Sequence, residues 1–233
     1  MNDQKHVEQL TLLDDLFPLI IPKHDEAHGI IAALLDYPHE RELRIVDLGC
    51  GFGGLTRALL DAFPAAVLFA VDSNLEILHK MREKLRDYGR IIPLHRDLSA
   101  TAWSNDIEQA TAVVSSFALD YLPPVRHRAV VEEAFALLEQ NGRWVSCEFY
   151  RSSDARVNRI FHDLEIRYVR TALEQGRVST EQLDRLSASD ILRQEHHIIS
   201  VEDKVQWLCD AGFTQVEVPW RFLNLAIVSG IKP

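Results

Sequence analysis

Short apolar segments of the kind that form β-strands alternate with helical segments through the middle of the chain, and this alternation constrains the fold most. The β-type segments are 43–48, 66–71, 90–95, 111–117 and 143–149. The helical segments are 54–63, about 75–88, and a helix from Pro123 and Pro124 to about Glu139 that Asn141-Gly142 would end. Such strands form a parallel sheet covered by helices on both faces, with right-handed crossovers. The pattern therefore predicts an α/β fold.

The C-terminal part of the chain departs from the strand-helix alternation. Ser200-Val201-Glu202-Asp203 predicts a helix that begins with a capping box and ends at 211–213. Two β-type segments follow, 214–218 and 222–229, and the interval between them is too short for a crossover helix. We therefore expect these two strands to pair antiparallel, which brings the expected strands to seven.

Two helical segments lie outside the sheet pattern. Residues 1–40 are predicted to be helical, with breaks at Pro18 and Pro22. Residues 151–195 contain no clear β-type run before the next helix, and Asp154 is placed to cap a long helix that Gly176 ends. A shorter helix could start near Ser179. We interpret 151–195 as a helical cap inserted after the fifth strand, over one end of the sheet.

Length and charge limit the organisation of the chain and its partners. The chain has 233 residues, which fits a single domain over 1–233 that includes the N-terminal helices and the cap insertion. The formal net charge is −10. Because an acidic surface repels phosphate backbones, a nucleic-acid partner is not expected. The N-terminal helices and the insertion are the segments that could support a homodimer.

The cysteines and apolar runs indicate the compartment. Cys50, Cys147 and Cys209 show no CxxC spacing and no disulfide framework. The N-terminal residues are polar, and prolines interrupt the apolar runs well short of the ~20 residues that a membrane helix needs. We therefore expect a cytoplasmic protein without a membrane partner.

A glycine-rich turn stands where the first strand meets the first helix of the alternating region. It reads Asp47-Leu48-Gly49-Cys50-Gly51-Phe52-Gly53-Gly54. Glycines let the backbone turn sharply and approach a ligand, and the following helix offers free N–H groups at its start. The same string also satisfies the GxGxxG dinucleotide fingerprint. The glycines alone therefore fit either S-adenosylmethionine (SAM) or NAD.

Three carboxylates favour SAM over NAD. Asp47 precedes the first glycine by two residues, and a carboxylate there suits a ligand that carries an ammonium and a sulfonium. Asp72 ends the second strand and is placed to accept hydrogen bonds from ribose hydroxyls. Asp97 follows the third strand, where it can accept the exocyclic amine of adenine. Ligands of parallel sheets bind at the carboxyl ends of the strands, where all three residues are expected.

From about Leu43 onward the chain resembles class I SAM-dependent methyltransferases. The likeness is carried by the glycine turn and by these further segments: Ala70-Val71-Asp72-Ser73, Arg96-Asp97, Ser115-Ser116-Phe117-Ala118-Leu119, 137–144, and Ala211-Gly212-Phe213. The resemblance implies a Rossmann-like sheet of seven mostly parallel strands with the last one antiparallel. It also implies methyl transfer from SAM, with S-adenosylhomocysteine as the product.

The resemblance further implies a set of cofactor-binding residues. Gly49 and Gly51, with Cys50 between them, would approach the methionine moiety. Asp72 and Ser73 would lie at the ribose, Asp97 and Leu98 at the adenine, and Ser115 and Phe117 at the methyl-bearing end. We interpret Cys50 as a small packing residue rather than a nucleophile.

A narrower likeness is to the carboxy-S-adenosylmethionine synthase branch, which serves tRNA wobble-uridine modification, and to its methyltransferase relatives. It rests on Leu16-Phe17-Pro18 followed by Pro22, the helical insertion, and the final Phe222-Leu223-Asn224-Leu225. Two positions depart from that branch. Ser189 aligns with its carboxylate-binding arginine, although Arg185 and Arg193 lie near, and His24 stands where the branch tends to carry a tyrosine.

These departures favour an ordinary methyltransferase with a small-molecule acceptor, which a cap over the sheet would enclose. The first alternative is a cofactor-modifying enzyme of the carboxy-synthase kind. The second is an NAD-binding oxidoreductase.

Methyl transfer needs little side-chain chemistry, because the sulfonium is an activated donor and alignment does most of the work. A base is required only for an acceptor that arrives protonated. The candidates on the acceptor side are His24, Asp120, Tyr121, Glu148 and Tyr150.

Other histidine patterns are interpreted without a metal. His24 and His28 share a helix face, but the HExxH order is absent, and we read them as polar residues at a helix start. His196-His197 is interpreted as part of a solvated connector. No metal site is expected.

Overall fold

The computed structural model describes residues 2–101, 103–187 and 196–233, with side chains from residue 11 onward. Its centre is a sheet of seven strands in the order β3-β2-β1-β4-β5-β7-β6. The strands are β1 (Arg44–Leu48), β2 (Val67–Asp72), β3 (Ile91–His95), β4 (Ala110–Ser116), β5 (Leu138–Phe149), β6 (Thr214–Phe222) and β7 (Leu225–Ile231). β7 runs antiparallel to both β5 and β6, and the other neighbouring strands are parallel. The predicted fold class is confirmed.

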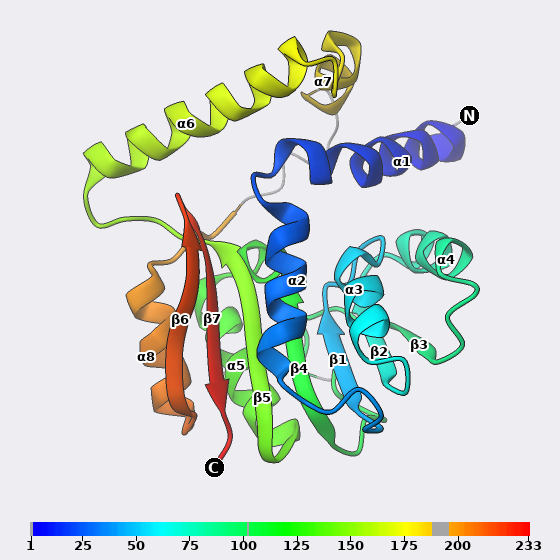
Figure 1. The fold of residues 1–233 in the computed structure, drawn as a ribbon, viewed down its shortest axis with the longest axis vertical. Helices are drawn as coiled ribbons and strands as arrows, with labels where there is room; N and C mark the ends of the chain where they lie inside the picture. The colour runs from blue at the N-terminus through cyan, green and yellow to red at the C-terminus, as the bar shows by residue number, and fades with distance from the viewer. Residues whose placement is uncertain (1, 102, 188–195) are drawn as a thin grey trace.

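Helices cover both faces of the sheet, as the apolar strands require (Figure 1). On one face, α2 (His24–Leu35), α3 (Gly54–Ala62) and α4 (Leu75–Lys84) bury residues such as Ile31, Leu59 and Met81. On the other, α5 (Pro124–Leu137) and α8 (Val201–Ala211) pack residues such as Val130 and Leu208 in a second cluster. A short 3₁₀ helix, η1 (Leu119–Tyr121), precedes α5. The two clusters fix the strand ends in space.

The prediction that Asn141-Gly142 ends the helix before the fifth strand is wrong. α5 ends at Leu137 and β5 begins at the next residue, so Asn141 and Gly142 lie inside the strand rather than at a helix end. Asn141 adopts φ 62°, and its N–H donates to the carbonyl of Lys232 at 2.8 Å. The left-handed residue that suggested a helix end instead bends an irregular strand.

Pro18 does not break the first helix. α1 spans Asn2–Ile20 with Pro18 inside it, and the turn to α2 comes at Pro22 and Lys23. A proline removes one backbone donor, and here it stands only two residues from the helix end, so little of the hydrogen-bond ladder follows it. α4 likewise ends at Lys84, four residues before the predicted limit.

The cap insertion consists of α6 (Ala155–Glu174) and α7 (Thr180–Ser187). Asp154 caps α6 by accepting from the Arg156 N–H, and the predicted capping box of α8 is present at Ser200 and Asp203. Helices α1, α6 and α7 lie together beyond the carboxyl ends of the parallel strands (Figure 1). Their shared core is small; its buried members are Leu12, Leu13, Leu16, Ala172, Val178 and Leu186.

Phe52 of the glycine turn packs against this cap core, so the cap rests on the turn. Among the described residues, no helix has both the length and the apolarity to cross a membrane.

Candidate cofactor and acceptor site

The glycine turn adopts backbone angles that side chains disfavour. Gly49, Gly51 and Gly53 have φ values of 69°, 52° and 81°. The N–H groups of Gly49 and Cys50 both donate to the carbonyl of Val71, at 2.8 and 3.0 Å, which ties the turn to β2. A Cβ on Gly49 would lie 2.2 Å from the Cβ of Ala118. Only glycine fits there, because the loop after β4 presses on the turn.

Gly51 is different, because a Cβ there would meet no atom within 4 Å. Its N–H donates to Oδ2 of Asp72 at 3.0 Å. The backbone at Gly51 is therefore held by Asp72, while the space that a Cβ would occupy is open. A ligand could approach the main chain closely at this point.

Asp47 is a buried carboxyl that pairs with no cation in the part of the chain that the structure describes. Its side chain is 1% exposed, and Oδ2 accepts a hydrogen bond from Oγ1 of Thr56 at 2.7 Å. Burial, with a smaller contribution from the neighbouring Asp72, raises the pKa of Asp47 to about 7. A buried carboxyl in this condition is ready to pair with a positive group.

Asp72 holds the turn and the start of α4 together. Oδ2 accepts from Gly51, and Oδ1 accepts from the N–H of Asn74 at 2.8 Å. Burial raises the pKa of Asp72. Each carboxylate oxygen keeps a second lone pair, so hydroxyl donors can still bind. Ser73 beside it is exposed, and its carbonyl contacts Nε2 of His95 at 3.0 Å.

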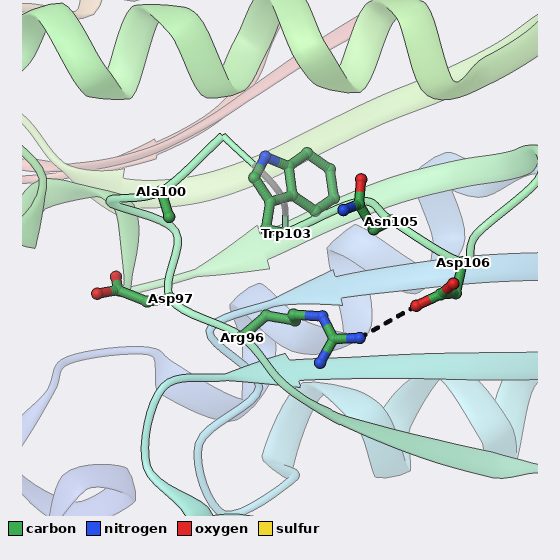
Figure 2. A pocket seen from close by; sticks show the side chains of 6 residues that line it. All are labelled: Arg96, Asp97, Ala100, Trp103, Asn105 and Asp106. Carbon is green, nitrogen blue, oxygen red and sulfur yellow. Dashed lines mark hydrogen bonds and ion pairs between the residues drawn. The ribbon is translucent and has the colours of Figure 1, made fainter.

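Asp97 is exposed and Leu98 is buried in the core. Oδ1 of Asp97 accepts from the Ser99 N–H at 2.8 Å, and this bond holds the pKa of Asp97 below its usual value. A cavity of about 370 Å³ opens next to Asp97 and contains an Arg96–Asp106 ion pair. Asp97 also lines this cavity, and Figure 2 shows its carboxylate pointing away from the ion pair.

Ser115 lies within β4 rather than after it. It is fully buried, and its hydroxyl contacts the Leu48 carbonyl at 3.0 Å and Oε1 of Glu148 at 3.1 Å. The single hydroxyl proton of Ser115 cannot be donated to both oxygens. If it is donated to the Leu48 carbonyl, the contact with Glu148 is a hydrogen bond when Glu148 is protonated and donates to the Ser115 oxygen. Burial raises the pKa of Glu148, which agrees with the protonated form.

Glu148 also shapes the loop after β4. Oε2 accepts from the N–H groups of Ala118 and Leu119, at 3.1 and 3.3 Å. These bonds hold Phe117 in a left-handed conformation with φ 56°. Glu148 is therefore a positioning group for the loop that presses on Gly49. Both of its oxygens are already hydrogen bonded within the protein, which does not suit a role as a base toward an external acceptor.

The ring of Phe117 faces the start of α2. It is stacked on the His24 ring at 5.6 Å between centroids, and Phe149 lies 5.7 Å away. His28 contacts His24 edge to face at 4.3 Å, and its Nε2 is hydrogen bonded to Oγ of Ser116 at 3.0 Å. His24 is thus the acceptor-side candidate that lies beside the predicted methyl end.

Asp120 and Tyr121 contact the segment that follows the cap. Oδ2 of Asp120 accepts from Nδ1 of His196 at 2.8 Å, and this bond raises the pKa of His196. Tyr121 lies on the His196 ring, and burial raises the pKa of Tyr121 to about 12. His196 lies in an irregular, exposed segment, as the interpretation as a solvated connector expects, and it also pairs with a carboxylate 76 positions away, which the sequence did not indicate.

Tyr150 is buried, and its hydroxyl has no hydrogen-bond partner among the described residues. Burial raises its pKa. Of the remaining predicted positions, Cys50 is buried beside Asp47, and burial raises the thiol pKa well above its usual value, as a packing residue requires. Arg185 is exposed on α7, whereas Ser189 and Arg193 lie outside the described residues.

Several site residues had no signal in the sequence. Lys204 is completely buried, with Nζ 2.7 Å from Nε2 of His127 and over the Trp144 ring. Burial lowers the pKa of Lys204, and Glu148 opposes that shift. Thr56 and Ser116 were likewise missed. Only the pairing of His28 with His24 had a signal, namely their spacing on one helix face.

The sheet order, the glycine turn and the acidic strand ends together define a class I SAM-dependent methyltransferase fold. Residues 45–142 match a family model described as a methyltransferase domain. A carboxy-S-adenosyl-L-methionine synthase of Chromohalobacter salexigens is 31% identical over 237 residues, covering 93% of this chain and 80% of the relative. The chain belongs to the SAM-dependent methyltransferase family that includes these synthases, and it is an enzyme.

Solved structures show the same fold. The SAM-dependent methyltransferase SibL matches with a TM-score of 0.59 at 21% identity, over 87% of this chain and 54% of that chain. Human N-acetylserotonin methyltransferase, crystallised with SAM, matches with a TM-score of 0.63 at 14% identity, over 97% and 56%. The chain spans about half the length of these two structures. The alternative of an NAD-binding oxidoreductase finds no support in these relatives.

The residues present fit SAM. Asp47 is a buried carboxyl that lacks a cation, and SAM carries an ammonium. Gly51 leaves open space above the turn, and Asp72 keeps free lone pairs beside it.

Proposed function

We propose that this enzyme transfers the methyl group of SAM to a small-molecule acceptor, with S-adenosylhomocysteine as the product. The observation that carries the proposal is the uncharged wall around Phe117 at the expected methyl end. The rings that meet it are those of His24, His28 and Phe149. Burial lowers the pKa of both histidines, that of His28 to about 3, so both are neutral near pH 7.

On the donor side, Asp47 would receive the ammonium group, and the backbone at Gly49, Cys50 and Gly51 would contact the methionine moiety. The pair Asp72 and Ser73 would bind the ribose. Asp97 and Leu98 would bind the adenine, with the side chain of Leu98 held in the core. These assignments join groups from three neighbouring strand ends, where ligands of parallel sheets bind.

Bound SAM would supply an activated methyl group on a sulfonium. The protein would then hold the acceptor atom in line with the carbon–sulfur bond, which is mainly a matter of positioning. Phe117 is fixed for this by the Glu148 bonds to the two N–H groups that follow it. The cap formed by α1, α6 and α7 would exclude water from the reacting atoms.

A carboxy-synthase activity is the second candidate, and the 31% identical relative specifically favours it. Such an enzyme must hold an additional carboxylate on its cofactor. The resemblance assigns that task to an arginine where this chain has Ser189. The neutral His24, in place of the branch's tyrosine, also offers no charge to a carboxylate.

Native mass spectrometry of the gently purified protein separates the two candidates. A methyltransferase should retain SAM or S-adenosylhomocysteine, and a carboxy-synthase should retain a species heavier by one carboxylate. The purified enzyme is then incubated with methyl-deuterated SAM and a panel of small hydroxyl, amine and thiol compounds. A labelled methyl group on an acceptor supports the proposal, whereas retention of carboxylated SAM with no labelled product would overturn it.

A further inference from the structure

His24 forms a dyad with its neighbour Asp25 at the start of α2. Nδ1 of His24 lies 2.8 Å from Oδ1 of Asp25. A carboxylate can only accept, so Nδ1 carries the proton and the basic lone pair stays on Nε2. No described residue is hydrogen bonded to Nε2. The His24 side chain is 11% exposed, more than that of the buried His28.

His28 cannot take the same role. It is 6% exposed, and its Nε2 is already bonded to Ser116. The His28 ring contacts the His24 ring edge to face, and the Phe117 ring stacks on the His24 ring, with 6.1 Å between the His28 and Phe117 centroids. Two rings from different elements therefore hold the His24 imidazole in one orientation. A base held in this way loses little entropy when a proton is transferred.

The charges that face His24 come from three elements. Asp25 lies on α2 itself, Asp14 on α1, and Lys84 on α4. Asp14 and Lys84 are ion-paired with each other at 2.6 Å, so their fields largely cancel at His24. On His28, Arg57 of α3 acts as a further positive neighbour. Burial outweighs these charges and keeps the His24 ring neutral, the form that accepts a proton.

We propose that His24 is the general base of the methyl transfer, oriented by Asp25, and that the acceptor is a neutral planar hydroxyl compound of the phenol class. This inference rests on the proposed methyl transfer. A planar acceptor would lie along the rings of Phe117 and Phe149. The rings of that wall are uncharged, and the charged neighbours of His24 are Asp25 and the ion-paired Asp14 and Lys84, so the wall suits a neutral acceptor.

The step is balanced as follows. The acceptor oxygen forms a bond to the methyl carbon while the carbon–sulfur bond breaks, and the electron pair of that bond stays on sulfur. The hydroxyl proton passes to Nε2 of His24. The imidazolium then releases this proton to solvent, which restores the neutral ring.

Two phenols distinguish a base from a merely structural residue. 4-Methylphenol resembles tyrosine, with a pKa of about 10, and needs a base near pH 7.5, whereas 4-nitrophenol is already largely ionised there. In single-turnover assays with methyl-deuterated SAM, His24→Gln should lower the rate with 4-methylphenol by about 10²–10⁴-fold. The rate with 4-nitrophenol should fall less than about tenfold, because deprotonation is no longer required.

The matched control is His79→Gln, since His79 is exposed on α4. Calorimetry with S-adenosylhomocysteine should give the same affinity for wild type, His24→Gln and His79→Gln. An equal loss with both phenols, or no loss with either, overturns the role of His24. Wild-type methylation of amines or thiols but of neither phenol overturns the acceptor class. No methylation of any acceptor by wild type overturns the proposed function itself.

Nitrogen NMR of histidine-labelled protein tests the dyad without turnover. In the S-adenosylhomocysteine complex, His24 should be neutral with its proton on Nδ1. The tautomer should shift toward Nε2–H in Asp25→Ala and persist in Asp25→Glu. A dominant Nε2–H tautomer in wild type contradicts the proposal.

A bound metal is the remaining outcome that would contradict the dyad. One ligand atom each from His24, Asp25 and His28 lie within 4.8 Å of one another. Turnover with 4-methylphenol should therefore be insensitive to a chelator. Loss of turnover on chelation, restored by a single divalent ion, reassigns the cluster as a metal site.

Discussion

The donor side and the acceptor side of the site are built differently. The proposed donor side is a set of backbone turns at strand ends, cross-linked by Asp72, Glu148 and the carbonyl of Val71. The acceptor side is covered by helices α1, α6 and α7, which share a small core, and α6 has only one buried residue, Ala172. A rigid donor site beneath a lightly held cover allows one fold to keep its cofactor while the acceptor varies.

The largest effect is expected at Gly49. In Gly49→Ala the new Cβ would overlap Ala118, and the residue would keep a positive φ. Overpacking and backbone strain together should lower the free energy of unfolding by about 2–4 kcal/mol. SAM binding should be lost in calorimetry. Gly89→Ala, where a Cβ meets no atom, is the control. Unchanged SAM affinity in Gly49→Ala contradicts the account of the turn.

Substitutions of two buried leucines compare the stability of the sheet core with that of the cap core. Leu59 lies in the core under the sheet, and Leu59→Ala should lower the free energy of global unfolding by about 2–5 kcal/mol. Leu16 lies in the cap core, so Leu16→Ala should open the cap locally. Hydrogen exchange of α1 should become faster by at least about tenfold with little change in Tm. Equal losses of Tm would show that cap and sheet unfold as one unit.

Two variants of Glu148 distinguish the contribution of its hydrogen bonds from that of its charge. Because the buried carboxyl is favoured in its protonated form, Glu148→Gln should nearly preserve stability and SAM affinity at pH 7. Glu148→Ala leaves two N–H groups and Ser115 short of a partner and should cost about 2–4 kcal/mol. Thermal unfolding from pH 5 to 9 checks the direction in which the contribution of Glu148 to stability changes with pH. Since burial raises the pKa of Glu148, its share of stability is present at low pH and is lost as pH rises. Glu148→Gln should flatten that loss.

Asp47 should make SAM binding depend on pH. Its pKa of about 7 means that the carboxyl is protonated below that pH and cannot pair with an ammonium. SAM affinity should fall up to about tenfold per pH unit below pH 7 and level off above it. The stability of the free protein should change with pH in the opposite direction. Because the pKa of Asp47 is raised in the folded state, its contribution to stability is present at low pH and is lost as the pH rises to about 7. Asp47→Asn should flatten both curves. A wild-type affinity that is constant between pH 5.5 and 8.5 excludes the proposed contact.

The positions of the residues proposed for the donor side could be predicted from the sequence far better than the contacts of the proposed acceptor side. Strand periodicity and the glycine spacing are local signals, and they placed Asp47, Asp72 and Asp97 at three neighbouring strand ends. The acceptor side depends on contacts between distant segments, such as Asp120 with His196 and His28 with Ser116. No periodicity encodes such pairs. The strand start at Leu138 was missed for a similar reason, since the left-handed Asn141 is typical of a helix end and here bends a strand.

Calorimetric titration of SAM into the wild-type protein and into Gly51→Ala tests the central claim most directly. In Gly51→Ala the new methyl group meets no protein atom within 4 Å, and the positive φ of 52° adds backbone strain of about 1–2 kcal/mol. We expect saturable binding of one SAM per wild-type chain, and thermal stabilisation of about 2.7 kcal/mol at a hundredfold excess over Kd. In Gly51→Ala the affinity should fall at least about tenfold, while the fold is retained. No binding to wild type, or equal binding to both proteins, would contradict it.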